Sequence, residues 1–500
     1  MARLFIFAIG GTGSRVLKSL VMLLGAGVKA RSQREYEIVP IVIDPHKSND
    51  DLNRTIRLLE NYQKIVESVG TENGFFATRL TTLDKLSTTD SRLSSAFTFN
   101  LQNVVNTKFQ EYISFSTLSE SSKALVDILF SGKSVDKRGD SIDLLDVEMD
   151  IGFVGNPNIG SVVLNQIKDS DEFKEFASNF GSDDRIFIIS SIFGGTGAAG
   201  FPTILKNIRN ADKLQGISSK KFLKDSKIGA ITVLPYFNIE TDDKSPIQKS
   251  HFIAKARSAL HYYKENITGN KSVNALYYIG DDFTGRPYRN DPGNNGQQND
   301  AHFVEIASAL AIFDFLEMGD SELESRDGRA VNPIYKEFGI KNDIDNITLS
   351  HLEDPTEDSI GKELAQFTLF YKFIQGQFSS SIGREPWSLQ SPSIDNQFTQ
   401  NSFFRTSIQE FFQSYEQWLK EMSSNRRGFS PFDLDADLVK LIRDKTASSG
   451  ILNGKLDYPK FNSYLNKVSN GKSFASSQQK LIKIFFEATN LIMKERFGSK

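Results

Sequence analysis

The sequence predicts an α/β fold with a parallel sheet, followed by a mainly helical C-terminal part. Over roughly the first 320 residues, short apolar runs that end in glycine or proline alternate with segments of helical spacing. Strands that alternate with helices form parallel sheets covered on both faces. Beyond about residue 330 helical patterns dominate. We therefore expect two domains, residues 1–325 and 326–500.

Five apolar runs are the expected strands, and the segment that follows the first of them has helical spacing. The runs are Leu4–Ile9, Ile38–Ile43, Ile186–Ile192, Ile228–Leu234 and Ala275–Ile279. A further segment, Ala301–Leu316, is rich in Ala, Ile, Leu and Phe over most of a helical surface. Such a helix is expected at the centre of the fold, where it is buried on all sides.

The C-terminal part is expected to consist of helices joined by a polar linker, Ser379–Asn401. The predicted helices are Ser359–Phe378, Phe403–Met422, Asp433–Arg443 and Ser476–Phe497. The last of them has one apolar face and several lysines. A helix of this kind either binds an acidic partner or a membrane surface, or docks on its own domain, which is the commoner case.

Composition limits the chemistry that the chain can perform. The 500 residues are 39% hydrophobic and 24% charged, which suits globular domains, and the net charge of −3 lacks the basic excess of a non-specific nucleic-acid coat. The chain has no cysteine, which excludes disulfides, iron–sulfur clusters and thiol nucleophiles. Any catalytic metal is expected to be a hard ion such as Mg²⁺, held by oxygens.

No apolar run approaches the roughly 18 residues of a membrane-spanning helix. The first apolar run is too short for an export signal, because Gly10–Gly13 interrupts it. We expect a cytoplasmic protein, with no clear nucleic-acid or membrane signal.

Two glycine loops carry the chemical signal: Gly10-Gly11-Thr12-Gly13-Ser14, and the segment from Gly194 to Gly200, whose sequence is GGTGAAG. Each lies between a predicted buried strand and a helix. Glycine permits close approach of the backbone to a ligand, and N–H groups at the start of the next helix favour a phosphate. A single loop of this kind is often only a tight turn, whereas two with a GGTG core favour a ligand site. Neither is a P-loop, and the first only half-matches G-x-G-x-x-G, because Val16 replaces the third glycine.

The segment Phe193–Ala199 resembles the GGTG signature of the tubulin/FtsZ superfamily, and other segments match that family in the same order. These are Gly10–Ser14, Asp44 after the second strand, Gly155–Gly160 (GNPNIG), Pro235–Glu240 (PYFNIE), Ile279–Asp282 and Ala301–Leu316. The resemblance covers roughly residues 1–320. It implies a tubulin/FtsZ-like, Rossmann-type nucleotide-binding domain with a parallel sheet and a central helix, in a divergent bacterial or phage-type branch.

The resemblance also implies GTP or GDP with Mg²⁺ as ligands, and a role for each matching position. The α- and β-phosphates would lie against the backbone of two loops, Gly10, Gly11, Thr12, Gly13 and Ser14, and Gly194, Gly195, Thr196, Gly197 and Ala198. Gly155, Asn156 and Pro157 would contact the γ-phosphate, and Asp44 would place Mg²⁺ through water. Glu240 would bond the ribose, and Asp281 with Phe303 would hold the base.

Several positions depart from the family pattern. Phe193 replaces a small residue, Ala199 replaces the last glycine of the signature, and Asn158 replaces an acid. At the base, Asp281 replaces the asparagine that reads guanine; His302 can stack in place of Phe303, and Glu305 can supply a hydrogen bond. The second, β-rich domain of the family is not found.

Family members complete hydrolysis between subunits, through an acidic loop after the central helix that orients the attacking water. No N-x-D-x-x-D follows the helix here. Asp320 and Asp327 fall in the right region and are the candidate catalytic residues, with Asn342–Asp345 further along. Each of these acids is alternatively an exposed loop residue.

The function expected from these motifs is a GTP-binding protein that self-associates into filaments and completes GTP hydrolysis between subunits. One alternative is a nucleotide-bound scaffold or sensor with little hydrolysis, whose helical C-terminal domain binds a partner protein. A weaker alternative is an NAD-dependent oxidoreductase. That interpretation explains Gly10–Gly13, but it explains neither the second glycine loop, Gly194–Gly200, nor Gly155–Gly160.

Overall fold

The computed structural model describes residues 1–32, 34–46, 49–72, 74–86, 97–136, 140–149, 152–153, 155–215, 219–236, 249–281, 299–338, 344–425, 427–449 and 454–498. The predicted ribose contact, Glu240, lies outside the described residues. So do Asp282 and the first two residues of Asn342–Asp345.

A six-stranded, all-parallel sheet forms the first part of the chain, in the order β10-β7-β6-β5-β1-β2. The strands are β1 (Ala2–Ile9), β2 (Tyr36–Ile43), β5 (Arg185–Ser191), β6 (Lys227–Val233), β7 (Ala275–Ile279) and β10 (Ile334–Phe338). The expected α/β class and parallel sheet are confirmed, and all five predicted strands are present. The sixth, β10, was not predicted, and it extends the sheet beyond residue 325.

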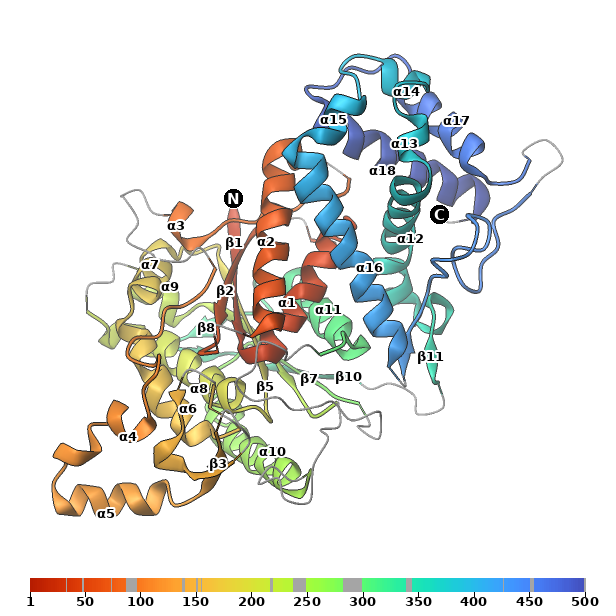
Figure 1. Cartoon of the computed structure of the whole chain (residues 1–500). Coiled ribbons are helices and arrows are strands. Elements are labelled where there is room, and N and C mark those ends of the chain that lie inside the picture. The colour runs from red at the N-terminus through yellow and green to blue at the C-terminus, as the bar shows by residue number, and fades with distance from the viewer. Residues whose placement is uncertain are drawn as a thin grey trace.

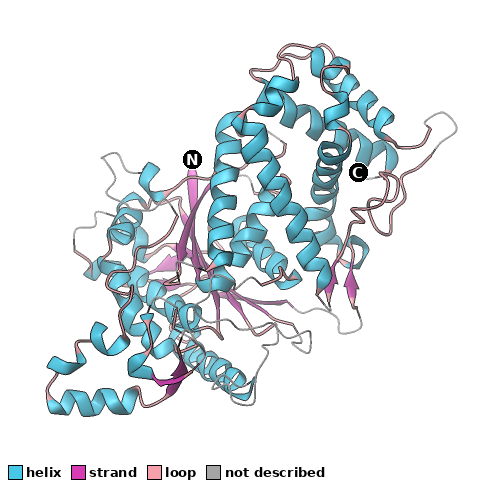
Figure 2. Cartoon of the chain, in the orientation of Figure 1, coloured by secondary structure: helices cyan, strands magenta, loops and turns pink. Residues whose placement is uncertain are grey.

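Helices cover both faces of this sheet (Figure 1, Figure 2). The helices α1 (Gly10–Gly25) and α11 (Phe303–Glu317) pack on one face, and α8 (Gly195–Arg209) packs on the other. Outside α8 lies α6 (Pro157–Leu164), and α10 (Lys249–Tyr263) places the Tyr263 ring 5.3 Å from that of Phe201 on α8. The helix predicted to be central, α11, is buried along most of its length.

The first helix is enclosed on all sides, since every residue of α1 except Gly11 is buried. One side faces the sheet, and the others face α2 (Asp50–Val69), α11 and the C-terminal helices. From α16 (Gln409–Ser424), Trp418 Nε1 donates a hydrogen bond of 3.1 Å to Ser19 Oγ. The helical part therefore completes the burial of α1.

The helical part is built on α12 (Asp354–Gly376), α16, α17 (Tyr458–Ser469) and α18 (Ser477–Arg496). Its aromatic core continues into the first part of the chain: the rings of Phe75 and Phe370 stack at 5.4 Å, and those of Phe76 and Phe411 lie 5.0 Å apart. The apolar face of α18 is buried, and the helix packs against α12 and α17. A division near residue 325 remains a prediction.

Two expectations for the helical part are wrong. Asp433–Arg443 forms turns rather than a helix, because the Asp433 carboxylate accepts hydrogen bonds from the backbone N–H groups of Asp435 and Ala436. The expected linker Ser379–Asn401 holds short helices, α14 (Pro386–Leu389) and α15 (Asn396–Gln400), and α13 (Phe378–Ser381) begins just before it. The helix α17 was not predicted, although Asp457 before it caps its first turn.

Smaller elements complete the structure. They are α3 (Leu83–Leu86), α4 (Phe109–Tyr112), α5 (Glu120–Leu129), α7 (Asp171–Asn179), α9 (Lys220–Lys224) and the two-stranded pairs β3 (Lys133–Val135) with β4 (Ser141–Asp143), β8 (Ser325–Arg326) with β9 (Arg329–Ala330), and β11 (Asn346–Ile347) with β12 (Gly428–Phe429). Figure 1 shows α4 and α5 standing out from the body, far from the helical part.

Among the described residues, no helix has both the length and the apolar character that crossing a membrane requires.

The close fit of α1 on the sheet predicts opposite effects at two glycines of the first loop. A β-carbon on Gly13 would lie 2.6 Å from the carbonyl carbon of Ala8, whereas one on Gly11 would meet nothing within 4 Å. We expect Gly13→Ala to lower the free energy of unfolding by about 1–3 kcal/mol. The matched Gly11→Ala should leave it unchanged or raise it by up to about 1 kcal/mol. Urea denaturation measures both, and equal effects would contradict this packing.

Candidate functional site

The glycine loops lie at the edge of the sheet where the parallel strands end. Ile9 pairs with Ile43 in register, so Gly10 and Asp44 follow neighbouring strands. The second loop follows β5, and Asp281 comes two residues after β7. The carboxyl edge of a parallel sheet is where open α/β proteins bind ligands. We call it the glycine edge.

The two glycine loops lie side by side. Strand β1 passes into α1 without a connecting residue, and Gly10 has a φ of +70°, which favours glycine. A β-carbon on Gly10 would lie 3.4 Å from Thr196 Cβ and 3.5 Å from the backbone nitrogen of Gly197. The starts of α1 and α8 thus lie side by side, with room for no more than a methyl group between them.

The third predicted loop, Gly155-Asn156-Pro157, joins the same point. A β-carbon on Gly195 would lie 2.9 Å from the backbone nitrogen of Asn156 and 3.1 Å from that of Gly155. Gly155 itself has a φ of +69°. The structure therefore brings the three loops together, with the starts of α1, α6 and α8 at one place. Thr12, Gly13 and Ser14 lie in the first turns of α1, and Ala198 lies in the first turn of α8.

No described side chain caps the start of α1, α6 or α8. Among the longer helices α12 also lacks such a cap, whereas α2, α7, α11, α17 and α18 each begin with a side chain that accepts a hydrogen bond from the first turn. The first N–H groups of a helix need partners outside the helix, and an anion supplies them. Three uncapped helix starts at one point therefore suit a ligand with several phosphate groups.

Two further polar groups stand beside these helix starts. The buried hydroxyl of Ser14 finds no hydrogen-bond partner among the described residues. Lys255, on α10, donates a hydrogen bond of 2.8 Å from Nζ to the carbonyl oxygen of Gly155. The lysine thus brings a positive charge to the third loop. No motif in the sequence marks Lys255, which is why the sequence did not predict it.

Asp44, the predicted metal residue, is buried at the end of β2. Burial raises the pKa of its carboxyl to about 7, and the negative charge of Asp51 acts in the same direction, against a hydrogen bond from the His46 N–H. A cation beside Asp44 and Asp51 would stabilise the charged form of Asp44 and lower its pKa. In the described part of the chain no three His, Asp or Glu residues gather to hold a metal, so Mg²⁺ here would need the phosphate oxygens of a ligand.

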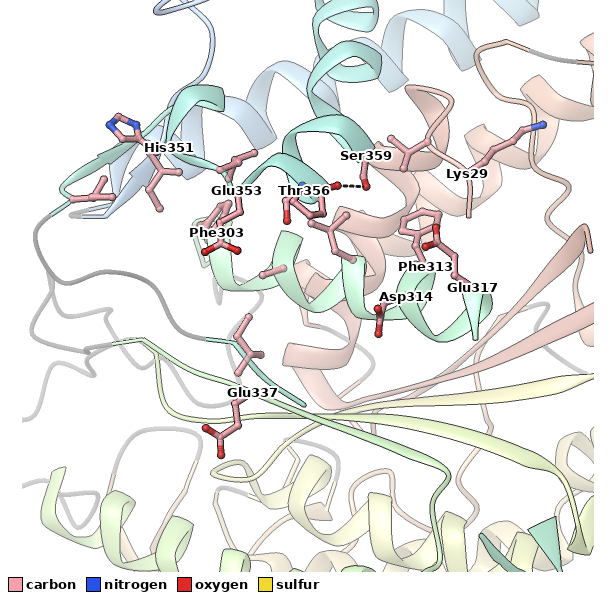
Figure 3. A pocket seen from close by; sticks show the side chains of 18 residues that line it. Lys29, Phe303, Phe313, Asp314, Glu317, Glu337, His351, Glu353, Thr356 and Ser359 are labelled. Carbon is pink, nitrogen blue, oxygen red and sulfur yellow. Dashed lines mark hydrogen bonds between the residues drawn. The ribbon is translucent and has the colours of Figure 1, made fainter. Parts of the chain in front are cut away.

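The predicted base contacts are already engaged with other side chains. Asp281 Oδ1 lies 2.8 Å from an Arg427 guanidinium nitrogen, which comes from the helical part. The Phe303 ring lies 5.3 Å from that of Phe429, and it faces a cavity of about 610 Å³ between α11 and the start of α12 (Figure 3). Glu305 contacts Arg15 instead and does not line this cavity. Phe303 and Glu305 therefore do not face a common space.

A buried charge network lies beneath the glycine edge. Arg15 donates to Glu305 Oε1 at 2.8 Å and to the Tyr236 hydroxyl at 2.6 Å, and its guanidinium lies 3.6 Å from Asp51 Oδ2. Burial opposes the charge on Arg15, but the neighbouring Tyr236, Glu305 and Asp51 raise its pKa well above the ordinary value. Arg15 was not predicted, although an arginine in a helix with only one other charged residue, Lys18, was a visible signal.

Glu421 on α16 joins the helical part to this network. Its carboxylate accepts hydrogen bonds from Lys18 Nζ at 3.0 Å, from Arg54 at 2.7 Å and from the backbone N–H of Ala301 at 3.2 Å. Arg54 also pairs with Asp51 at 2.6 Å. One carboxylate thus connects α1, α2 and the segment before α11.

The candidate catalytic acids lie at the amino ends of the parallel strands, the edge of the sheet opposite the glycine loops. Asp320 contacts Arg185 at 2.9 Å and Lys227 at 3.1 Å, the first residues of β5 and β6. Burial opposes its ionisation, but these two cations bring the pKa of Asp320 down to about 2. Asp327 lies in the turn between β8 and β9, with a φ of +51°. Neither acid can reach the glycine edge of its own chain.

Comparison with known proteins adds little to this geometry. No protein-family model matches the sequence, and no curated protein matches it. Among solved structures, CetZ from Methanosaeta thermophila strain DSM 6194 is similar at a TM-score of 0.22 and 12% identity, over 63% of this chain. The match spans about half of CetZ, 52% of that chain. A likeness this weak carries no argument about function.

The pKa of His302 predicts a pH-dependent stability. Burial, with the nearby charges of Arg15 and Arg427, lowers it from 6.5 to about 4. Between these values the unfolded chain binds more protons than the folded one, so stability is full above pH 6.5 and falls as the pH drops toward 4. His302→Asn keeps a capping side chain and removes the titration.

Between pH 7 and pH 4 the free energy of unfolding falls in both proteins. We expect this fall to be about 2–3 kcal/mol smaller in His302→Asn than in wild type. Urea denaturation at both values measures the difference. The control is His261→Asn, at an exposed histidine of α10, which should behave as wild type. Identical pH profiles for His302→Asn and wild type would contradict a buried, neutral His302.

Proposed function

We propose that the chain is a tubulin/FtsZ-like GTP-binding protein that self-associates head to tail into filaments and hydrolyses GTP between subunits. The observation that carries the proposal is the meeting of three uncapped helix starts at the glycine edge. Their N–H groups offer a multiple phosphate site on rigid elements. The order of the sequence motifs resembles that of the tubulin/FtsZ superfamily, and this resemblance favours GTP over other phosphate ligands.

In this proposal the first and second loops bind the α- and β-phosphates through backbone N–H groups, and the Ser14 hydroxyl becomes satisfied. Gly155, Asn156 and Pro157 contact the γ-phosphate, whose charge Lys255 complements from its position on the Gly155 carbonyl. Asp44 holds Mg²⁺ through water. When bound, Mg²⁺ neutralises charge that develops on the phosphate oxygens during transfer.

For the nucleoside, Glu240 is the proposed ribose contact. Asp281 and Phe303 are the proposed base contacts, with His302 and Glu305 as the alternatives beside them. The ion pair between Asp281 and Arg427 means that a base reaching Asp281 also meets the guanidinium of Arg427. Residues 326–500 would thus contribute to base recognition.

The distance across one chain supports hydrolysis between subunits rather than within one chain. Helix α11 runs from the glycine edge to the opposite edge, and its 15 residues span about 22 Å. That is several times the reach of an aspartate side chain. Asp320 or Asp327 can orient water at a γ-phosphate only if that edge of one copy meets the glycine edge of the next.

Nucleotide binding tests the proposal directly. We expect wild type to bind GTP in the presence of Mg²⁺, and Gly195→Ala with Thr196→Ala to weaken it at least tenfold, because the methyl group displaces the third loop and the hydroxyl is lost. The control is Thr203→Ala, two turns along the same helix. Isothermal titration calorimetry and mass spectrometry of co-purified nucleotide provide the measurements. No nucleotide binding by wild type, or full binding by the double variant, would refute the site.

Mixing two inactive variants tests hydrolysis between subunits. Asp320→Asn keeps intact glycine loops, and the Gly195→Ala, Thr196→Ala variant keeps Asp320. We expect each alone to lose at least tenfold in GTPase rate, and an equal mixture to recover about a quarter of the wild-type rate, since a quarter of the contacts are intact on both sides. Asp327→Asn is tested in the same way. A mixture no faster than its parts would exclude the acid as a trans-acting residue.

A nucleotide-bound scaffold or sensor is the second candidate, and one observation favours it. The Asp320 carboxylate is already bound to Arg185 and Lys227, with Arg34 at 3.2 Å, so it is not held ready for a water molecule. In that case the helical part serves a partner protein. A near-zero GTPase rate that stays flat across protein concentrations, together with stable GTP binding, would select this function.

A further inference from the structure

The protruding helix α5 carries an apolar face that nothing in the described structure covers. None of its ten residues is buried. Leu125, Ile128 and Leu129 are 56%, 73% and 58% exposed, and their i, i+3, i+4 spacing places them on one side of the helix. Short helices are marginal in water without packing, and contiguous exposed apolar side chains mark interaction sites.

This apolar face stands beside the glycine edge. Asn158 Nδ2, at the start of α6, lies 3.5 Å from the carbonyl oxygen of Leu129, and Asn156 donates a hydrogen bond of 3.2 Å to Ser134 in the strand after α5. Val162, one turn beyond Asn158 on α6, is 39% exposed. We call Leu125, Ile128, Leu129 and Val162 the α5 surface.

The opposite edge of the sheet offers a counterpart. Phe222, on α9, is 52% exposed, and α9 leads into the first residue of β6. The end of α9 touches the turn that holds Asp327, because the Gly328 N–H donates a hydrogen bond of 2.8 Å to Asp225. The α5 surface thus adjoins the proposed γ-phosphate loop, and Phe222 adjoins the proposed catalytic acid.

Charge selects α9 over a second α5 surface as the partner. Lysine occupies three of the five α9 positions, and neither Lys220 nor Lys221 forms an ion pair among the described residues. On α5, the acids Glu120 and Asp127 outnumber Lys123, which pairs with Glu120 at 3.0 Å. Two α5 helices face to face would bring like charges together, whereas α5 against α9 brings opposite charges together.

We propose that the α5 surface of one copy packs on Phe222 and the lysines of α9 of the next copy. The proposal rests on head-to-tail association, and it names the contact that aligns the glycine edge with Asp320 and Asp327. Because the two surfaces differ and lie at opposite edges, each copy keeps one of each available. Such a heterologous contact extends into a filament rather than closing as a dimer.

Single charged substitutions test the contact without cost to the fold, since these side chains are exposed. We expect Ile128→Asp and Phe222→Asp each to raise the protein concentration needed for assembly at least tenfold, while GTP affinity stays unchanged. The control is Leu389→Asp, at a leucine 58% exposed in the helical part, which should assemble as wild type. Sedimentation velocity and pelleting, with and without GTP, measure assembly, and titration calorimetry measures binding.

A charge exchange tests the pairing itself. Asp127→Lys and Lys221→Asp should each raise the assembly concentration about threefold, and the double variant should return it close to wild type. The Ile128→Asp variant assembling normally would overturn the proposal. The proposal would also be overturned if Ile128→Asp prevented assembly and Phe222→Asp did not, because α5 would then contact another surface.

The same measurements separate this contact from the nucleotide hypothesis. If wild type binds no GTP but still assembles in a way that depends on Ile128 and Phe222, the proposed GTPase function fails and the contact stands. If wild type binds GTP and neither Ile128→Asp nor Phe222→Asp changes assembly, the contact fails and the nucleotide site stands.

Discussion

The buried carboxylate of Glu421 is the polar link between the two parts of the chain, which also share an aromatic core. It accepts hydrogen bonds from Lys18, Arg54 and the Ala301 N–H, which belong to three separate segments. Buried charges are costly unless they are paired, and removal of one partner leaves the others without compensation. The positions of α1, α2 and α16 are therefore interdependent. Arg15, with Glu305 and Asp51, imposes the same condition one turn closer to the glycine edge.

These constraints explain why the glycine loops sit on rigid elements. The first loop is the first turn of a helix enclosed by the sheet, by neighbouring helices and by α16. The second loop begins a helix whose glycines approach Ser191 and Ile9 closely. A phosphate site built this way has its N–H groups aligned before the ligand arrives, so binding costs little ordering of the backbone.

The sequence predicted the parts of the fold that have a local pattern. Buried strands show as apolar runs, and the glycine loops show by composition. It missed β10, because Ile334–Phe338 (IYKEF) has two adjacent charged residues, Lys336 and Glu337, and forms no apolar run. It could not predict the charge network, since Arg15 and Glu305 are 290 positions apart, and Lys18 and Glu421 are 403 apart. The place of Asp320 follows from the direction of α11, which no motif encodes.

The late position of β10 has a consequence for how the chain folds. This strand comes after the central helix, yet it pairs with β7 at the edge of the sheet. Helix α16, later still, also packs on α1. A nascent chain that ends near residue 325 therefore lacks the sixth strand and leaves the side of α1 that faces α16 uncovered, until the helical part emerges. The two parts share one core, so they acquire their stability together.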